Sequence, residues 1–228
     1  NSKRSMPTAD TIFLIVGSSQ MYRAYHAIRG LTGPEGQSTN AVYGFITMQR
    51  KLVDDHQPEL LAAAFDLKGP TFRHELSEDY KANRRPMPDD LVEQVPWVHD
   101  ACAALGVPVV TQAGVEADDV LGSLALRAVA AQLDVVLVTG DKDFFQLVGD
   151  HIRIFNPRDE GIWYDTNGVQ QKFGVRPDQV VDTLAIMGDA SDNVKGVPGI
   201  GEKGARALIS EYGSLDELLK RAADLPRK

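Results

Sequence analysis

The chain has 228 residues, of which 43% are hydrophobic and 25% are charged, and its formal net charge at pH 7 is −8. A chain of this length can bury one substantial core, and its sequence has neither an apolar run long enough to span a membrane nor the apolar segment of a signal peptide after Asn1. The single cysteine, Cys102, can form no internal disulfide and is expected in the core. Composition therefore argues against a membrane protein or a disulfide-stabilised protein, and it predicts a soluble, intracellular protein.

Apolar runs alternate with helical periodicity over most of the chain. Buried strands are expected at 11–16, 60–65, 107–111 and 134–139, and helices after residue 17 and at 39–56, 89–105 and 118–131. Two further short strands, 152–155 and 162–164, are expected at an edge, as a hairpin. This order predicts an α/β fold with a central, mostly parallel, twisted sheet and helices on both faces.

No strand pattern is apparent after residue 165. Helices are expected at 176–187, 201–212 and 214–222. We therefore expect an α/β core over residues 1–165 and a helical region over residues 166–228, packed together as one structural unit.

Acidic residues follow three successive strands of the predicted sheet. In chain order they are Asp66, then Glu116, Asp118 and Asp119, then Asp141 and Asp143. Because the carboxyl ends of parallel strands share one edge, these side chains should converge there. Like charges at such distances are costly unless a cation lies among them, and all-oxygen ligands suit Mg²⁺ or Mn²⁺. Each acid alone could instead cap a helix, but caps would not place acids after three strands, so we favour a metal site.

The acidic net charge at first argues against a nucleic-acid partner, because phosphate binding usually needs a basic surface. However, the six acids above, with Asp189 and Asp192, would together carry the whole net charge of −8. The rest of the chain would then be neutral, and basic residues elsewhere could still form a binding surface.

Residues 68–88 form a polar, proline-bounded segment that is long for a connection. It contains Arg73, Lys81 and Arg84, which can pair with phosphate, and Tyr80, on which a base could stack. A solvated charged loop is the alternative.

Glycines are closely spaced between the first and second helices of the helical region. Gly196, Gly199 and Gly201, followed by Lys203, allow a tight turn whose N–H groups can face an anion at the start of the next helix. The order fits neither a dinucleotide fingerprint nor a Walker loop. A plain helix–turn–helix connection with glycine caps is the alternative.

Several of these segments are long and specific. They are TNAVYGF, AAAFDLKGPTFRHELSEDYKANRRPMPDDL, EADDVLG, VTGDKDFFQLV, FGVRPDQVVDTLAIMGDASDN and GVPGIGEKGA. They resemble the 5′-nuclease domain of bacterial DNA polymerase I and, more widely, the flap endonuclease family, from Thr11 to Leu219. The resemblance implies a resolvase-like (PIN-like) core, a helical arch over residues 68–88 and a C-terminal helix–hairpin–helix. It also implies structure-selective 5′-3′ exonuclease or flap endonuclease activity on DNA with a 5′ flap or 5′ end.

The resemblance implies roles for individual residues and for cofactors. Asp66, Glu116 and Asp118 match ligands of a first divalent cation, with Asp119 close by, and Asp141, Asp143, Asp189 and Asp192 match those of a second. Lys81 and Arg84 match arch residues that would hold the scissile phosphate, with Arg73 and Tyr80 as further DNA contacts. The turn of Gly196, Gly199, Gly201 and Lys203 would grip the duplex and hold K⁺. The resemblance further implies a monomer in the bacterial cytoplasm, associated with the nucleoid, with a polymerase in the same chain or as a separate partner.

One position departs from the family pattern. Where the family has Asp-Gly-Ser-Ser at the end of the first strand, with the Asp as a metal ligand, this chain has Val16 before Gly17, Ser18 and Ser19. Valine offers no oxygen, so a cation there would be bound more weakly. Natural divergence towards binding, a tolerated loss with water as ligand, and a deliberate substitution that traps substrate are three explanations. The alternatives to a nuclease are a catalytically impaired flap-binding module and a generic metallophosphatase.

Overall fold

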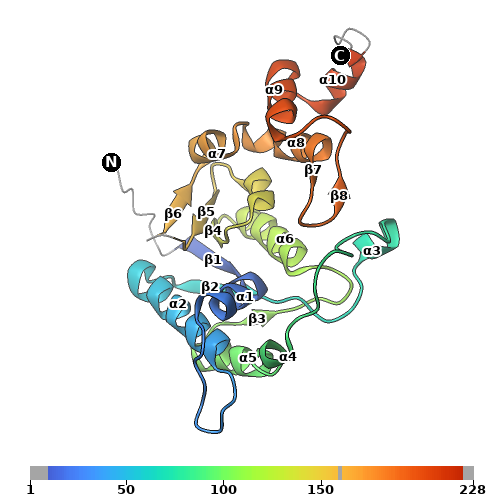
Figure 1. Ribbon diagram of the computed structural model, residues 1–228. Coiled ribbons are helices and arrows are strands. Elements are labelled where there is room, and N and C mark those ends of the chain that lie inside the picture. Colours follow the sequence, from blue (N-terminus) through green and yellow to red (C-terminus); the bar gives the residue numbers. More distant parts are fainter. Residues whose placement is uncertain (1–9, 159–160, 223–228) are drawn as a thin grey trace.

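The computed structural model describes residues 10–158 and 161–222 (Figure 1). Its centre is a six-stranded sheet with the order β3-β2-β1-β4-β5-β6. The strands are β1 (Thr11–Val16), β2 (Leu60–Ala64), β3 (Val109–Val110), β4 (Asp134–Val138), β5 (Ile152–Asn156) and β6 (Ile162–Tyr164). Neighbouring strands are parallel except β5 and β6, which pair antiparallel at the edge. The predicted mostly parallel sheet is thus confirmed, and the expected edge hairpin is present.

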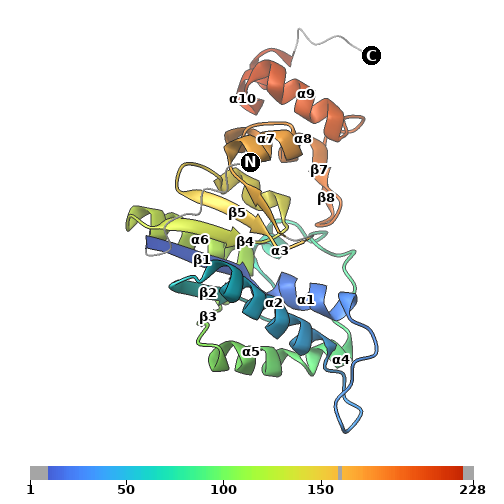
Figure 2. The same ribbon diagram turned by 90° about the vertical axis from the view of Figure 1, so that its left-hand side faces the viewer.

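Helices cover both faces of this sheet. The α-helices are α1 (Gly17–Ala27), α2 (Asn40–His56), α3 (Phe72–Leu76), α4 (Asp89–Val92), α5 (Val95–Ala104), α6 (Ala117–Ala130), α7 (Thr166–Phe173), α8 (Val180–Met187), α9 (Glu202–Tyr212) and α10 (Leu215–Lys220), and η2 (Lys142–Leu147) and η3 (Pro177–Gln179) are 3₁₀ helices. In Figure 2, α1, α2 and α5 lie below the strands, and α7 to α10 lie above them. The chain therefore has helices on either side of one sheet, as parallel strands require.

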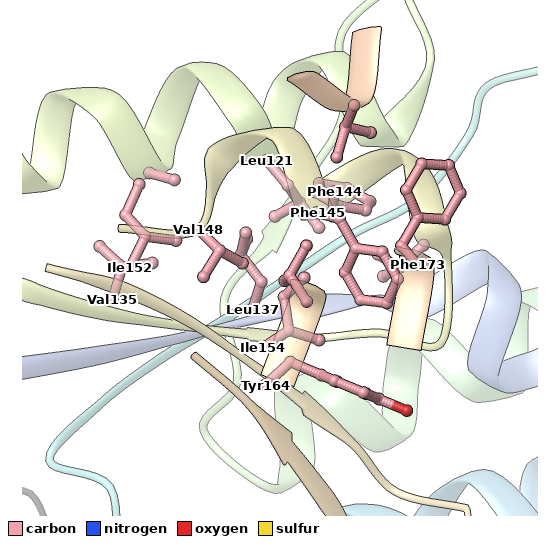
Figure 3. Close-up of a cluster of buried hydrophobic side chains, with 14 of the residues drawn as sticks. Leu121, Val135, Leu137, Phe144, Phe145, Val148, Ile152, Ile154, Tyr164 and Phe173 are labelled. Atoms are coloured by element: carbon pink, nitrogen blue, oxygen red, sulfur yellow. The ribbon is translucent and has the colours of Figure 1, made fainter. Parts of the chain in front are cut away.

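The two faces of the sheet carry separate hydrophobic cores because side chains alternate along each strand. On one face, Ile15 of β1 packs with Phe45 of α2. On the other, Leu137 of β4 packs with Leu121 of α6 and Phe145 of η2 in the cluster of Figure 3. Burying each of these side chains stabilises the fold by about 1.5–3 kcal/mol. The sheet edge that holds the acids is therefore fixed from both sides.

One expected helix differs from the structure. The single helix predicted at 89–105 is wrong: α4 ends at Val92 and α5 begins at Val95, with Pro96 in its first turn. Proline has no N–H to continue a preceding helix and favours the start of a new one. At the start of α1, whose N-cap is Val16, the hydroxyl of Ser18 accepts a hydrogen bond from the Asp66 N–H.

A small hairpin in the C-terminal region was not predicted. Strands β7 (Gly188–Asp189) and β8 (Val194–Lys195) pair antiparallel, so the expectation that no strand follows residue 165 is wrong. Strands of two residues are too short to produce an alternating sequence pattern. At their open end, Gly196 lies so close to the end of α8 that an added Cβ would stand 2.3 Å from the carbonyl carbon of Met187. In Figure 1 the hairpin extends from the upper helices towards the segment that contains α3.

Within the described ranges, no helix is long and apolar enough to cross a membrane. Cys102 is buried in α5 with a free thiol, as expected for a core residue.

Candidate active site

A cavity of about 770 Å³ lies at the carboxyl ends of the central strands. The strand order reverses between β1 and β4, and ligands of open α/β sheets bind outside such a reversal. All eight acids singled out in the sequence line this cavity, namely Asp66, Glu116, Asp118, Asp119, Asp141, Asp143, Asp189 and Asp192. Val16, Arg73, Tyr80, Lys81 and Arg84 line it as well. Residues distant in the sequence thus face one space.

The start of α6 positions four of these carboxylates. Glu116 is the N-cap residue and forms a capping box with Asp119, whose Oδ2 accepts from the Glu116 N–H at 3.0 Å. Asp66, just beyond β2, accepts from the N–H of Ala117 at 2.8 Å. Acids at a helix N-terminus also interact favourably with the helix dipole. The helix-cap alternative therefore describes Glu116, while Asp118, in the first turn, is left facing the cavity.

Two of the carboxyl groups have strongly raised pKa values. Burial, followed by the charges of Asp141 and Asp66, raises the pKa of Asp118 to about 7. Burial and the charge of Asp141 raise the pKa of Asp143 to about 6. The Oδ1 atom of Asp143 is buried and has no hydrogen-bond partner. Such crowding of like charges is unfavourable in the protein alone and is relieved when positive charge is placed nearby.

The segment 68–88 supplies positive charge to the same cavity. Lys81 Nζ lies 2.6 Å from Glu116 Oε1, and Arg84 Nη2 lies 2.6 Å from Asp192 Oδ1. Arg73 forms a bidentate pair with Asp119 at 2.6 and 2.7 Å. The arch is largely non-helical in this arrangement, since α3 is five residues long and turns follow it. Its basic side chains are held against the acids.

The side chain of Tyr80 is buried and is not placed for stacking on a base. Its side chain is 7% exposed, and its hydroxyl donates towards Glu116 Oε2 at 3.0 Å and Asp192 Oδ2 at 3.1 Å. Burial and the two carboxylates raise the pKa of Tyr80 far above its usual value, so it stays protonated. In this arrangement Tyr80 joins the arch to both α6 and the hairpin β7–β8.

Backbone contacts fasten the arch to the hairpin. The Lys81 N–H donates to the Asp192 carbonyl at 2.9 Å, and the Asn83 amide donates to the Ala190 carbonyl at 3.0 Å. Lys81 has a positive φ of 54°, which is uncommon for a residue with a side chain. The arch and the hairpin are therefore one connected wall of the cavity.

Lys142 is a site residue that the sequence analysis missed. It lies between Asp141 and Asp143, and its Nζ is 2.5 Å from Asp189 Oδ2. Burial alone would raise the pKa of Asp189, but hydrogen bonds from Lys142 and Ser191 outweigh it and hold that pKa at about 2. The signal was present, since Lys142 stands inside the acidic motif, but a lysine there could equally have pointed to solvent.

Val16 closes the central part of the cavity with an apolar side chain. It is the last residue of β1, is 5% exposed and belongs to the core on the α6 face. The strand end nearest the order reversal thus contributes no oxygen ligand.

Within the part of the chain that the structure describes, no group of three or more His, Cys, Asp or Glu side chains meets the geometry of a metal site. Lys81, Arg84 and Lys142 lie among the carboxylates instead. The donor chemistry nevertheless fits a hard divalent cation, because the acidic groups offer only oxygen and the buried Asp143 Oδ1 lacks a hydrogen-bond partner.

The glycine turn lies outside the cavity. Gly199 has a φ of 82°, Gly201 is the N-cap of α9, and Lys203 is exposed in the first turn of that helix. The turn therefore has the left-handed glycine and the helix start that the sequence suggested.

Comparison with protein families identifies the chain. Residues 11–174 match the model of the 5′-3′ exonuclease N-terminal resolvase-like domain. This chain belongs to the 5′-3′ exonuclease family. Residues 175–228 of this family member match the C-terminal SAM fold of the same family.

The exonuclease-family chain is similar in sequence to bacterial DNA polymerases I. It is 47% identical over 213 residues to DNA polymerase I of Pseudomonas aeruginosa, covering 93% of this chain and 23% of that protein. It is 42% identical over 209 residues to the thermostable DNA polymerase I of Thermus aquaticus, covering 92% of this chain and 25% of that protein. The chain thus spans about a quarter of the length of these relatives.

Solved structures share the fold of this exonuclease-family chain. The T5 5′-exonuclease with bound zinc has a TM-score of 0.77 at 23% identity, covering 96% of this chain and 81% of that one. Flap endonuclease-1 from Methanococcus jannaschii has a TM-score of 0.61 at 16% identity, covering 94% of this chain and 74% of that one. The resolvase-like fold inferred from the sequence is confirmed.

Proposed function

We propose that this chain is a metal-dependent 5′ nuclease that hydrolyses DNA at a 5′ end or a 5′ flap. The observation that carries the proposal is the meeting of eight carboxylates, from the ends of the central strands and from the β7–β8 hairpin, in one cavity whose outer wall is basic. A phosphodiester presents a negative group with oxygens that hard cations and basic side chains can both bind. Membership of the 5′-3′ exonuclease family supports the same reaction class.

Two divalent cations, Mg²⁺ or Mn²⁺, would be held by the acidic groups. Asp66, Glu116 and Asp118, with Asp119 beside them, would serve one cation, and Asp141, Asp143, Asp189 and Asp192 would serve the other. When bound, such cations stabilise negative charge on the phosphate oxygens. The T5 neighbours include a structure described as a complex with DNA and metal ions, which supports the same ligands here.

The arch residues would exchange partners when DNA binds. Lys81 and Arg84 are paired with Glu116 and Asp192 in the protein alone. Neutralisation of those carboxylates by cations would release both side chains towards the scissile phosphate, where positive charge stabilises the transition state. Arg84, whose side chain is 54% exposed, can reorient with little loss of packing.

Contacts further along the DNA would come from the C-terminal region. The turn of Gly196, Gly199 and Gly201, with Lys203, would bind the duplex backbone, and K⁺ would bind at its carbonyls. A polymerase, in the same chain or as a separate protein, is the expected partner, because the relatives are DNA polymerases. We further propose that the protein acts on nucleoid DNA as a monomer.

A catalytically impaired flap-binding module is the second candidate, and Val16 is the observation that favours it. With Val16 at the end of β1, the cavity would be one carboxylate short of the pattern that the family resemblance implies. Weaker cation binding would lower the cleavage rate and leave DNA binding intact.

The test is cleavage of a labelled 5′-flap DNA in Mg²⁺ or Mn²⁺, beside binding of the same DNA in Ca²⁺. We expect both binding and slow cleavage, and we expect Val16→Asp to raise the rate by at least about tenfold, equivalent to about 1.4 kcal/mol. Equal rates for the two proteins would remove Val16 as a cause of weak activity. Binding without any cleavage would favour the binding module, and hydrolysis of small phosphate esters without DNA binding would favour a phosphatase.

A further inference from the structure

A second cavity, of about 220 Å³, lies beside the candidate active site. Three basic residues from different segments of the chain line it. They are Lys142 of η2, Arg158 beyond β5 and Lys172 of α7, and we call this space the basic cavity. Thr139, at the end of β4, lines both cavities. The basic cavity therefore lies directly behind the segment that carries Asp141.

The positive charge of the basic cavity is largely unpaired. Lys142 is bonded to Asp189 across the segment, but neither Arg158 nor Lys172 forms an ion pair with a residue in the described ranges. Both side chains belong to exposed residues and are free to turn towards a bound group. Two cationic side chains without an ion-pair partner among the described residues, at one small cavity, favour an anionic ligand.

Arg23 of α1 adds charge next to this cavity. A Cβ added to Gly140 would lie 3.1 Å from Arg23 Nη2 and 3.3 Å from the Asn156 amide, so Arg23 and Asn156 lie close to the backbone of this glycine. Arg23 Nη1 is buried without a hydrogen-bond partner. Burial and then the charge of Arg158 lower the pKa of Arg23. An anion between the two arginines would offset this repulsion and satisfy the donor.

The remaining walls suit a phosphate group attached to an organic residue. The Asn156 Oδ1 accepts the backbone N–H of Arg158 at 3.2 Å, which leaves the amide nitrogen as a donor. Phe145, Ile154 and Tyr164 provide an apolar floor. Arginine and lysine with a neutral amide donor are typical phosphate ligands.

We propose that the basic cavity is a phosphate-binding subsite in which Arg158 and Lys172 are the ion-pairing residues and Asn156 is a neutral donor. If the phosphate belongs to a DNA strand, which rests on the function proposed above, the subsite positions that strand beside the candidate active site. A free 5′-mononucleotide presents the same chemical group. Arg158 and Lys172 are in either case binding residues and take no part in bond breaking.

The test compares two double variants with the same change in charge. Arg158→Gln with Lys172→Gln alters the basic cavity, and Arg50→Gln with Arg127→Gln alters exposed residues of α2 and α6 that line neither cavity. Binding of a fluorescent 5′-flap DNA in Ca²⁺ is measured between about 50 and 200 mM salt. We expect the cavity variant to bind about tenfold more weakly at the lower salt, with the slope of log K against log salt reduced by about 1–2, and the control to change less than about twofold.

A second arm measures binding of thymidine 5′-monophosphate, with thymidine as control, by NMR shift changes. If the cavity variant binds only the DNA more weakly, the result supports a phosphate of a DNA strand. If it binds only the monophosphate more weakly, the result supports a free nucleotide. If the cavity variant matches the control variant in both arms, the subsite does not exist. A wild-type chain that binds no DNA contradicts the proposed function, and the monophosphate arm then decides the cavity by itself.

Discussion

At the residue scale, the candidate active site keeps charges that cost the fold stability. Asp118 and Asp143 are crowded by other carboxylates and partly buried, and both have raised pKa values. The nearby basic side chains are committed to other acids, Lys81 to Glu116 and Lys142 to Asp189. Groups kept in such unfavourable surroundings are typical of functional sites, because selection for stability alone would replace them.

We predict that Asp118→Asn separates stability from metal binding. In the presence of a chelator, removal of one of the crowded charges should raise the free energy of unfolding by on the order of 1 kcal/mol. In titrations with Mn²⁺, the same variant should lose most of its affinity, because a charged oxygen ligand becomes a neutral one. Urea unfolding and calorimetry measure the two effects.

Asp54→Asn is the matched control, since Asp54 is exposed on α2 and lies outside the cavity. The Asp54→Asn variant should change neither the free energy of unfolding nor the affinity for Mn²⁺ measurably. A chelator-treated Asp118→Asn protein that is less stable than the wild type would contradict the view that this carboxylate is under repulsion.

At the element scale, regular and buried segments could be predicted from the sequence, and short or polar ones could not. Strand β1 was expected with its observed bounds because it is buried and continuously apolar. The break between α4 and α5 depends on a single proline, and the hairpin β7–β8 depends on glycines and tertiary contacts with no sequence period. Six of the acids were found because they follow predicted strands, and Asp189 and Asp192 through the family resemblance. The pairing of Lys142 and the burial of Tyr80 depend on three-dimensional neighbours.

The docking of the arch on the hairpin gives a prediction at this scale. Tyr80→Phe removes the hydroxyl that joins Glu116 and Asp192, leaving each carboxylate with one less donor. We expect a loss of about 1–2 kcal/mol in the stability of this contact. Hydrogen exchange at the Lys81 amide, which donates to the Asp192 carbonyl, should therefore accelerate by roughly tenfold.

Tyr43→Phe provides the comparison, because Tyr43 is 57% exposed on α2 and far from the arch in sequence. In the Tyr43→Phe variant, the Lys81 amide should exchange at the same rate as in the wild type. Equal protection in both variants would mean that backbone contacts alone hold the arch.

At the scale of the whole molecule, one sheet supports two cores and the C-terminal helices. The core on the α6 face continues from Leu137 of β4 to Ile209 of α9, so strands and C-terminal helices share buried contacts. The opposite core contains Phe45 and Cys102. Because β1 and β4 contribute side chains to both cores, the loss of either core should destabilise the whole fold.

We predict that Phe145→Ala lowers the free energy of unfolding by about 3–5 kcal/mol in a single transition. Phe145 is 6% exposed and packs against Tyr164 and Phe173. Fluorescence of Trp97 on α5 and of Trp163 on β6, each followed in a variant that lacks the other, should report the same urea midpoint. Two different midpoints would mean that the chain unfolds in separate units.

The first turn of α6 combines two roles in the same side chains. Glu116 and Asp119 cap the helix through backbone amides, and Asp66 accepts from the next amide, while all three also face the cavity. A substitution at any of them therefore disturbs the architecture together with the chemistry. Kinetic defects in such variants become interpretable only beside unfolding data for the same proteins, whereas Asp118, which caps nothing, reports on the chemistry more directly.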